Sequence, residues 1–209
     1  MILLVGAACG SGGSAAPPEG SREVVITSGD AELDATVMGD GASAVVISHG
    51  ANGRRNDFYD IVEAFAEAGF VAIAYDARRD HRVEDLESAV AWAREQGATR
   101  LVLLGGSYGA CLSVTNAVAL DADVVIGLST APDCEANAID AARDFGDVVA
   151  QFVVAEGDDG FVPTAEALAD ATDTELIVAD GDAHGSGVTN EHPEIIDDLV
   201  TIASEPLPD

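Results

Sequence analysis

The stretch Leu101–Ala110, LVLLGGSYGA, decides the fold. Four apolar residues lead into Gly105-Gly106-Ser107-Tyr108-Gly109, and a helical pattern follows at once. This order predicts a buried strand, a sharp turn and a helix, with Ser107 on the turn. The turn matches G-x-S-x-G, whose glycines make room for a tight bend that projects the serine hydroxyl from the end of a strand. Taken alone, the same stretch also suits a glycine-rich turn whose serine only caps the helix.

Composition limits the class of protein. A chain of 209 residues suits one domain with a full core, and an apolar content of 48% excludes disorder. The formal net charge is −29, and all nine basic residues are arginine. Such a surface repels nucleic acid and anionic lipid, so we expect neither as a partner. No stretch approaches the roughly 20 apolar residues that span a bilayer.

The N-terminal segment differs in composition from the rest. Met1–Ala8 is apolar and is followed by Cys9 and then by GSGGSAAPPEG. This resembles the end of a bacterial lipoprotein signal peptide, in which such a cysteine is lipidated, although Gly6 replaces the usual leucine and no positive segment precedes it. We therefore separate residues 1–20, a signal remnant and linker, from a globular domain at 21–209. Lipid on Cys9 implies export and anchoring at the cell envelope. An incidental cysteine implies a cytoplasmic protein.

The order of apolar patterns predicts the architecture. Two β-rich runs, 23–28 and 33–38, are joined by a Gly-Asp turn and predict an antiparallel hairpin at one edge. From residue 44 onward, buried strand patterns alternate with amphipathic helices, which predicts a mostly parallel sheet with helices on both faces. The expected strands are Ala44–Ser48, Phe70–Tyr75, Leu101–Leu104, Val124–Leu128, Val148–Ala155 and Glu175–Ala179. About 20 residues connect the fourth and fifth of these strands, which leaves no room for an inserted lid.

Residues with catalytic chemistry follow the ends of these strands, where sites form in such sheets. Ser107, the pair Asp158 and Asp159, and His184 occur in that order along the chain. A serine hydroxyl is a poor nucleophile at neutral pH. It needs an imidazole to accept its proton, and a carboxylate must orient that imidazole. The sequence supplies all three groups.

Several markers together carry a family resemblance. Besides G-x-S-x-G, they are His49-Gly50 after a strand, Val162-Pro163 before a helix, and Ala183-His184-Gly185 near the C-terminus. Over about residues 22–204 the chain resembles the α/β-hydrolase family, nearest to its small, lidless dienelactone-hydrolase and esterase members. The resemblance implies an α/β-hydrolase fold with an N-terminal antiparallel hairpin and no lid domain.

The resemblance also implies catalytic roles. Ser107 would be the nucleophile, and His184 the general base and then the general acid. Asp159 would be the acid member of the triad, judged by its distance from Val162-Pro163. Asp158 stays an alternative, because the spacing from Gly157 is one residue shorter than in the family pattern.

The oxyanion hole would consist of backbone N–H groups. The resemblance implies those of Tyr108 and Ala51, with Asn52 as an alternative second donor. For His49 it implies a residue that fixes the loop after the strand, and the alternative is a second catalytic histidine.

Cysteines and arginines leave alternatives open. If Cys9 carries lipid, Cys111 and Cys134 remain, either as a disulfide in an exported protein or as two buried thiols. Four arginines lie on two loops near the expected cleft, where they would bind a substrate carboxylate or pair with local acidic residues. They are Arg54, Arg55, Arg78 and Arg79.

These observations predict a serine hydrolase that cleaves small carboxylic esters or lactones through an acyl-enzyme. No His, Cys or Asp cluster has metal-ligand spacing, so we expect no metal, and the chemistry requires no cofactor. A peptidase or thioesterase would use the same triad. An alternative of another class is a non-catalytic tethered binding protein on a hydrolase fold.

Overall fold

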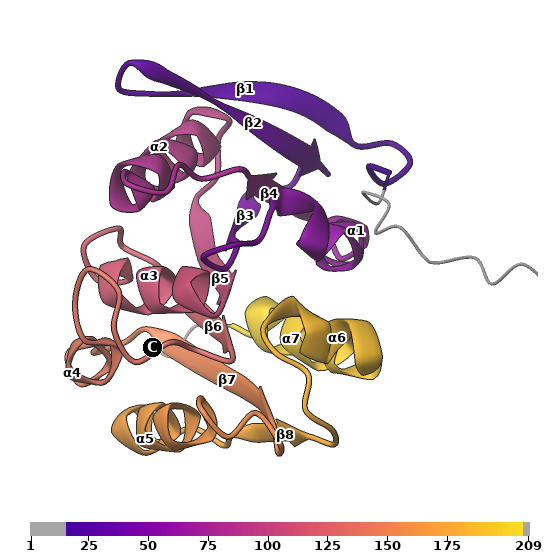
Figure 1. The fold of residues 1–209 in the computed structure, drawn as a ribbon. Helices are drawn as coiled ribbons and strands as arrows, with labels where there is room; N and C mark the ends of the chain where they lie inside the picture. Colours follow the sequence, from indigo (N-terminus) through magenta and orange to yellow (C-terminus); the bar gives the residue numbers. More distant parts are fainter. Residues whose placement is uncertain (1–15, 207–209) are drawn as a thin grey trace, which may run out of the picture.

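The structure is a computed structural model that describes residues 16–206. It contains one eight-stranded sheet with the strand order β1-β2-β4-β3-β5-β6-β7-β8 (Figure 1). The strands are β1 (Arg22–Ser28), β2 (Ala31–Met38), β3 (Ser43–Ser48), β4 (Phe70–Tyr75), β5 (Arg100–Gly106), β6 (Val124–Leu128), β7 (Val149–Ala155) and β8 (Ile177–Ala179). The first two strands form the predicted antiparallel hairpin at one edge, and β2 continues antiparallel to β4. The pairs from β4 through β3 to β8 are parallel, which confirms the predicted sheet.

Helices cover both faces of the sheet, as Figure 1 shows. One face carries α2 (Arg82–Glu95), α3 (Tyr108–Asn116), α4 (Ala138–Ala142) and α5 (Val162–Thr172). The other carries α1 (Tyr59–Glu67), α6 (Ser186–Glu191) and α7 (Glu194–Ser204), with the short helix η1 (Arg55–Phe58) before α1. Each face has its own apolar core, because strands buried on both faces alternate their side chains between the two layers.

The structure and the sequence-based expectations differ at one short helix. The sequence pattern does not predict α6, because six residues are too few to show helical periodicity. The connection between β6 and β7 carries only α4, which confirms the absence of a lid. Cys9 and most of the segment 1–20 lie outside the described residues. Among residues 16–206 no helix has both the length and the apolar character to cross a membrane.

The turn between β5 and α3 depends on two close backbone approaches. A Cβ atom on Gly109 would lie 2.1 Å from the Ser48 carbonyl oxygen at the end of β3. One on Gly105 would lie 2.4 Å from the carbonyl of Gly109. The glycines therefore let α3 begin directly against the ends of two strands, and Ser107 is held between them with a φ angle of 55°.

We predict that Gly109→Ala lowers the free energy of unfolding by about 1–3 kcal/mol, because the new methyl group meets backbone that cannot move aside. The gain in helix propensity, about 1 kcal/mol, does not offset this clash. Urea unfolding would measure the change. Gly160→Ala is the matched control, since a Cβ there meets no atom within 4 Å. We expect its effect to stay within about 0.5 kcal/mol, and equal effects of the two substitutions would contradict this account of the turn.

Candidate functional site

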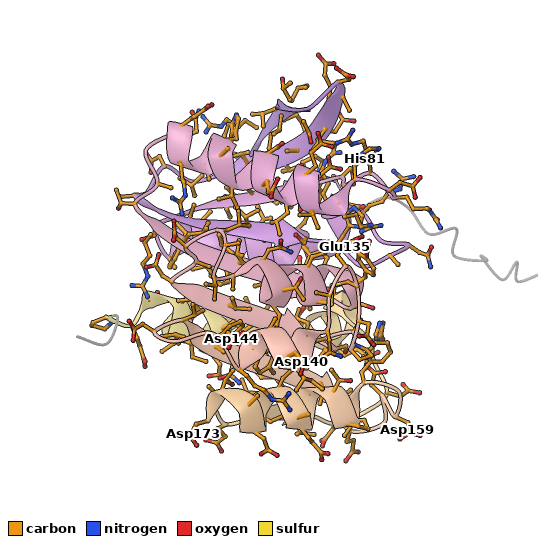
Figure 2. All side chains as sticks on the ribbon, turned by 90° about the vertical axis from the view of Figure 1, so that its left-hand side faces the viewer. His81, Glu135, Asp140, Asp144, Asp159 and Asp173 are labelled. Carbon is orange, nitrogen blue, oxygen red and sulfur yellow. A yellow bond between two sulfur atoms is a disulfide. The ribbon has the colours of Figure 1, made fainter. Side chains whose placement is uncertain are left out.

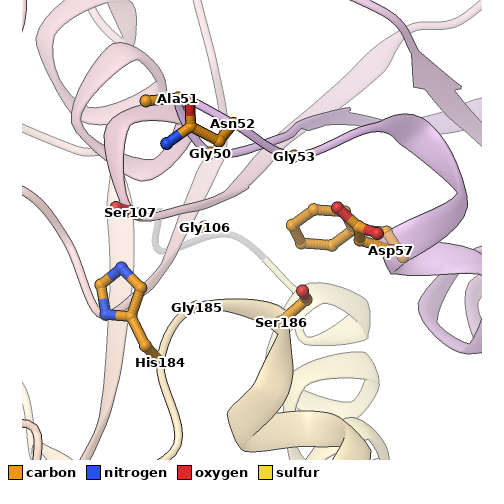
Figure 3. Close-up of a pocket in the computed structure, with 11 residues that line it drawn as sticks. Gly50, Ala51, Asn52, Gly53, Asp57, Gly106, Ser107, His184, Gly185 and Ser186 are labelled. Atoms are coloured by element: carbon orange, nitrogen blue, oxygen red, sulfur yellow. The ribbon is translucent and has the colours of Figure 1, made fainter. Parts of the chain in front are cut away.

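Ser107 lies on the strained turn after β5 and lines a pocket of about 240 Å³. His184 and the loop of residues 50–53 line the same pocket (Figure 3). A non-glycine residue with positive φ is uncommon and costs conformational energy. The close packing at Gly105 and Gly109 holds Ser107 in this conformation. The turn therefore presents the Ser107 side chain to the pocket at the carboxyl ends of the strands.

His184 forms a hydrogen-bonded pair with Asp158. The distance from His184 Nδ1 to Asp158 Oδ2 is 2.8 Å, and the carboxylate is 10% exposed whereas the imidazole is 41% exposed. A carboxylate accepts, so Nδ1 carries the proton and Nε2 keeps a lone pair. The Phe161 ring packs on the imidazole with 4.2 Å between ring centroids, a contact that the sequence did not predict.

The imidazole lies beside Ser107 (Figure 3). In the part of the chain that the structure describes, the hydrogen bond of the His184 ring goes to Asp158, and none joins it to the Ser107 hydroxyl. Catalytic hydrogen bonds in structures without substrate are often long and shorten when the substrate binds. The two side chains are thus placed in one pocket and on facing elements.

Asp158, and not the predicted Asp159, is the carboxylate at His184. The Gly157 N–H donates to the Gly181 carbonyl at 2.8 Å, which draws the turn after β7 against the loop that carries His184. The next residue, Asp158, then faces the imidazole. Asp159 is exposed and lies at the outer surface (Figure 2). The spacing from Val162-Pro163 therefore pointed to the neighbour of the aspartate that contacts His184.

The loop after β3 places backbone donors near Ser107. The Gly50 carbonyl accepts the Gly53 N–H at 3.1 Å and faces His49 Nδ1 at 2.7 Å. Carbonyl and N–H groups point in opposite directions across a trans peptide, so the Ala51 N–H is directed away from these partners. The Tyr108 N–H is in the first turn of α3, where a helix supplies no acceptor. Both groups therefore remain available as donors.

His49 is a buried residue that fixes this loop. Its Nε2 accepts the Ala77 N–H at 3.0 Å, so its proton is on Nδ1 and is donated to the Gly50 carbonyl. Burial lowers the pKa of His49, an effect that the hydrogen bond to Gly50 partly opposes. A ring engaged at both nitrogens fits the loop-fixing interpretation rather than that of a second catalytic histidine.

Arg82 also organises the loop, a role that no sequence pattern predicts. The side chain is only 5% exposed, and its guanidinium donates to the carbonyls of His49, Gly50 and Ala51, the last at 2.9 Å. It also lies 5.2 Å from the centroid of the Tyr108 ring. Only the tertiary fold reveals this role, because Arg82 is one of several arginines in a polar stretch.

Two further contacts hold the elements around Ser107. Cys111 of α3 and Cys134 form a disulfide with 6.0 Å between their Cα atoms, which decides between the two alternatives left open for these cysteines. Ser129, which follows β6 with a φ angle of 47°, accepts the Gly185 N–H at 3.0 Å. This hydrogen bond links the loop that carries His184 to the end of β6.

The four loop arginines fall into two groups. Arg55 pairs with Asp76 and Glu23, and Arg78 pairs with Asp85 and Glu84. Within residues 16–206, neither Arg54 nor Arg79 forms an ion pair with a carboxylate. In the same range, no group of three or more His, Cys, Asp or Glu side chains is arranged to hold a metal ion.

We predict that His49 and His192 titrate on opposite sides of the ordinary value of 6.5. Burial lowers the pKa of His49, whereas the hydrogen bond from His192 to the Asp180 carbonyl raises that of His192. His49 therefore contributes stability above pH 6.5 that is lost as the pH falls through its folded pKa. His192 contributes stability below pH 6.5 that is lost as the pH rises through its folded pKa. NMR titration of the ring resonances, assigned with single His→Gln variants, would measure both. A reversed order would contradict the assigned causes.

Comparisons with known proteins identify the fold. No family model and no curated protein sequence matches the chain. Among solved structures, an esterase of Pyrococcus furiosus has a TM-score of 0.74 at 14% identity, covering 90% of this chain and 92% of that one. A lidless α/β serine hydrolase from Xanthomonas campestris has 0.66 at 20%, covering 92% and 97%. Dienelactone hydrolase from Anabaena variabilis has 0.66 at 18%, covering 89% and 96%. The chain therefore has the α/β-hydrolase fold in its lidless form.

Proposed function

We propose that this protein is a serine hydrolase that cleaves carboxylic esters, lactones included, through an acyl-enzyme. The observation that carries the proposal is the pocket in which Ser107 and the His184–Asp158 pair meet. A strained serine turn, an imidazole and an orienting carboxylate are the parts of a nucleophilic triad. Structural neighbours described as esterases support the same reaction class.

The mechanism follows from these groups. His184 Nε2 accepts the Ser107 proton while the serine oxygen attacks the ester carbonyl. His184 then protonates the departing alkoxide, and water activated by the same nitrogen releases the acid. Asp158 keeps the imidazole in the required tautomer and stabilises its protonated form.

The oxyanion of the tetrahedral intermediate would accept the N–H groups of Ala51 and Tyr108. The Gly50 carbonyl, which is engaged by His49 and Gly53, supports Ala51, and the start of α3 supports Tyr108. We favour these backbone donors over Asn52, because a fixed peptide costs no reorganisation during the reaction. Arg82 is a positioning residue here, since it holds the carbonyls of the loop on the side away from Ser107.

The pocket suggests the size of the acyl group. Its volume of about 240 Å³ is below the usual range for sites that enclose drug-sized ligands. Phe58 and Gly106 supply apolar walls, and Asp57 and Ser186 supply polar ones. We therefore propose short-chain esters as substrates.

The disulfide supports the proposal that the protein is exported. Disulfides persist in oxidising compartments and are rare in the cytosol of most organisms. The Cys111–Cys134 bond is thus in keeping with a chain anchored at the envelope through lipid on Cys9.

Replacing the triad residues would test the assignment. Ser107→Ala is expected to abolish hydrolysis of short activated esters, and Asp158→Asn to lower kcat by roughly 10²–10⁴-fold. The neighbouring Asp159→Asn is the matched control, because its side chain faces solvent, and we expect activity close to that of the unmodified protein. A larger loss in Asp159→Asn than in Asp158→Asn would overturn the choice of acid.

A fluorophosphonate probe separates the enzyme from the non-catalytic alternative. Labelling at Ser107 requires an activated serine, so we expect labelling of the unmodified protein and none of Ser107→Ala. A folded sample that resists labelling would favour the tethered binding protein.

We predict that Arg82→Met lowers kcat by at least about tenfold with little change in KM. Methionine retains much of the buried stem volume but donates no hydrogen bond to the loop, so the oxyanion donors lose their fixed orientation. Steady-state kinetics would separate kcat from KM, and thermal unfolding would show that the sample is folded. Unchanged kcat would exclude a positioning role for Arg82.

A further inference from the structure

A second pocket lies behind the loop that borders the catalytic pocket. Its volume is about 280 Å³. Ala51, Asn52 and Gly53 line both pockets, whereas Ser107 and His184 line only the first. The two cavities are therefore neighbours with one shared wall, and the proposed nucleophile and general base lie outside the second.

Three of the nine arginines line this second pocket: Arg54, Arg79 and Arg82. Within residues 16–206 none of the three forms an ion pair with a carboxylate. The chain has 38 acidic residues against nine basic ones, so such a gathering of unpaired cations is unlike the rest of its surface. Without a counter-charge, the three guanidinium groups repel one another.

The burial of Arg82 is a further reason to expect a negative group in the pocket. It is 5% exposed, and its guanidinium contacts neutral carbonyl groups. Burial lowers the pKa of Arg82, and the charge of Arg79 lowers it further, whereas Tyr108, Tyr75 and the Asp85 carboxylate raise it. Asp85 is itself paired with Arg78. Buried charges in proteins are normally paired, so a negative group in the pocket would complete this environment.

The carboxylate that lines the pocket does not fill that role. Both oxygens of Asp76 face Arg55, one at 2.9 Å from the Arg55 N–H and the other in an ion pair with its guanidinium. Arg55 does not line the pocket. The charge of Asp76 is therefore balanced from outside, and the three lining arginines keep their excess positive charge.

We propose that this second pocket binds a small oxyanion, a carboxylate or phosphate group, between Arg54, Arg79 and Arg82. Guanidinium groups suit such ligands because their planar donors match the spacing of two oxygens. The ligand is either a free anion or the anionic arm of an ester whose carbonyl lies at Ser107. Binding of an anion at this site does not require turnover at Ser107.

Binding is tested in the Ser107→Ala variant, so that the result does not depend on turnover. Inorganic phosphate and succinate are titrated by calorimetry at constant ionic strength, and the backbone amide NMR signals of residues 51–53 are followed. We expect saturable binding that shifts these signals, and we expect Arg79→Gln or Arg54→Gln to weaken it about tenfold or more.

Arg143→Gln is the matched control. It removes the same charge from an exposed arginine that pairs with Asp140 outside the pocket, so we expect unchanged binding. If neither phosphate nor succinate binds saturably, the proposed site is wrong. The proposal would also be wrong if Arg143→Gln lost as much anion affinity as Arg79→Gln or Arg54→Gln, because that would indicate a general effect of charge.

The source of the anion is distinguished in the unmodified protein by comparing monomethyl succinate with neutral methyl butyrate. This comparison rests on the proposed function, whereas the binding test does not. If Arg79→Gln lowers kcat/KM about tenfold for the charged ester alone, the anion belongs to the substrate. If it leaves both esters unchanged but abolishes phosphate binding, the ligand is a free anion. If Arg79→Gln lowers kcat/KM equally for both esters and still binds phosphate, the proposal is wrong.

Discussion

The structure depends on the close approach of α3 to the ends of β3 and β5. The Ser48 carbonyl occupies the space that a side chain on Gly109 would need, and the Gly109 carbonyl does the same for Gly105. Because of that contact, Ser107 is held in a strained conformation at the rim of the sheet, and the first N–H groups of α3 point toward the same space. The proposed nucleophile and one proposed oxyanion donor thus depend on the same local constraint.

The remaining parts of the site reach Ser107 from distant segments, and each is tied to the sheet by polar contacts. The loop after β3 is held by His49 and Arg82. The loop after β8 is held by Ser129 at Gly185 and by Asp158 at His184. Hydrogen bonds of buried groups are costly to leave unmade, so these contacts set loop geometry more strictly than apolar packing would.

Charge distribution separates the functional end of the molecule from its general surface. Acidic side chains such as Asp140, Asp144 and Asp173 lie over the outer surface (Figure 2). At the carboxyl ends of the strands, Arg54, Arg79 and Arg82 instead line a pocket together with residues 51–53. The proposed anion site is at that place, whereas the acidic side chains elsewhere repel anions.

The sequence by itself determined the sheet, its hairpin edge, the absence of a lid, and the placement of Ser107 and His184 at strand ends. These features follow from hydrophobic periodicity and from glycine spacing, which are local properties of the chain. It did not determine which of two adjacent aspartates faces His184, because side chains of neighbouring residues point in different directions and only the packing of Gly157 on Gly181 selects Asp158. Nor did it reveal the role of Arg82 or the second pocket, and it left open whether Cys111 and Cys134 are bonded. Those arise from contacts between segments far apart in the sequence, which only the tertiary structure brings together.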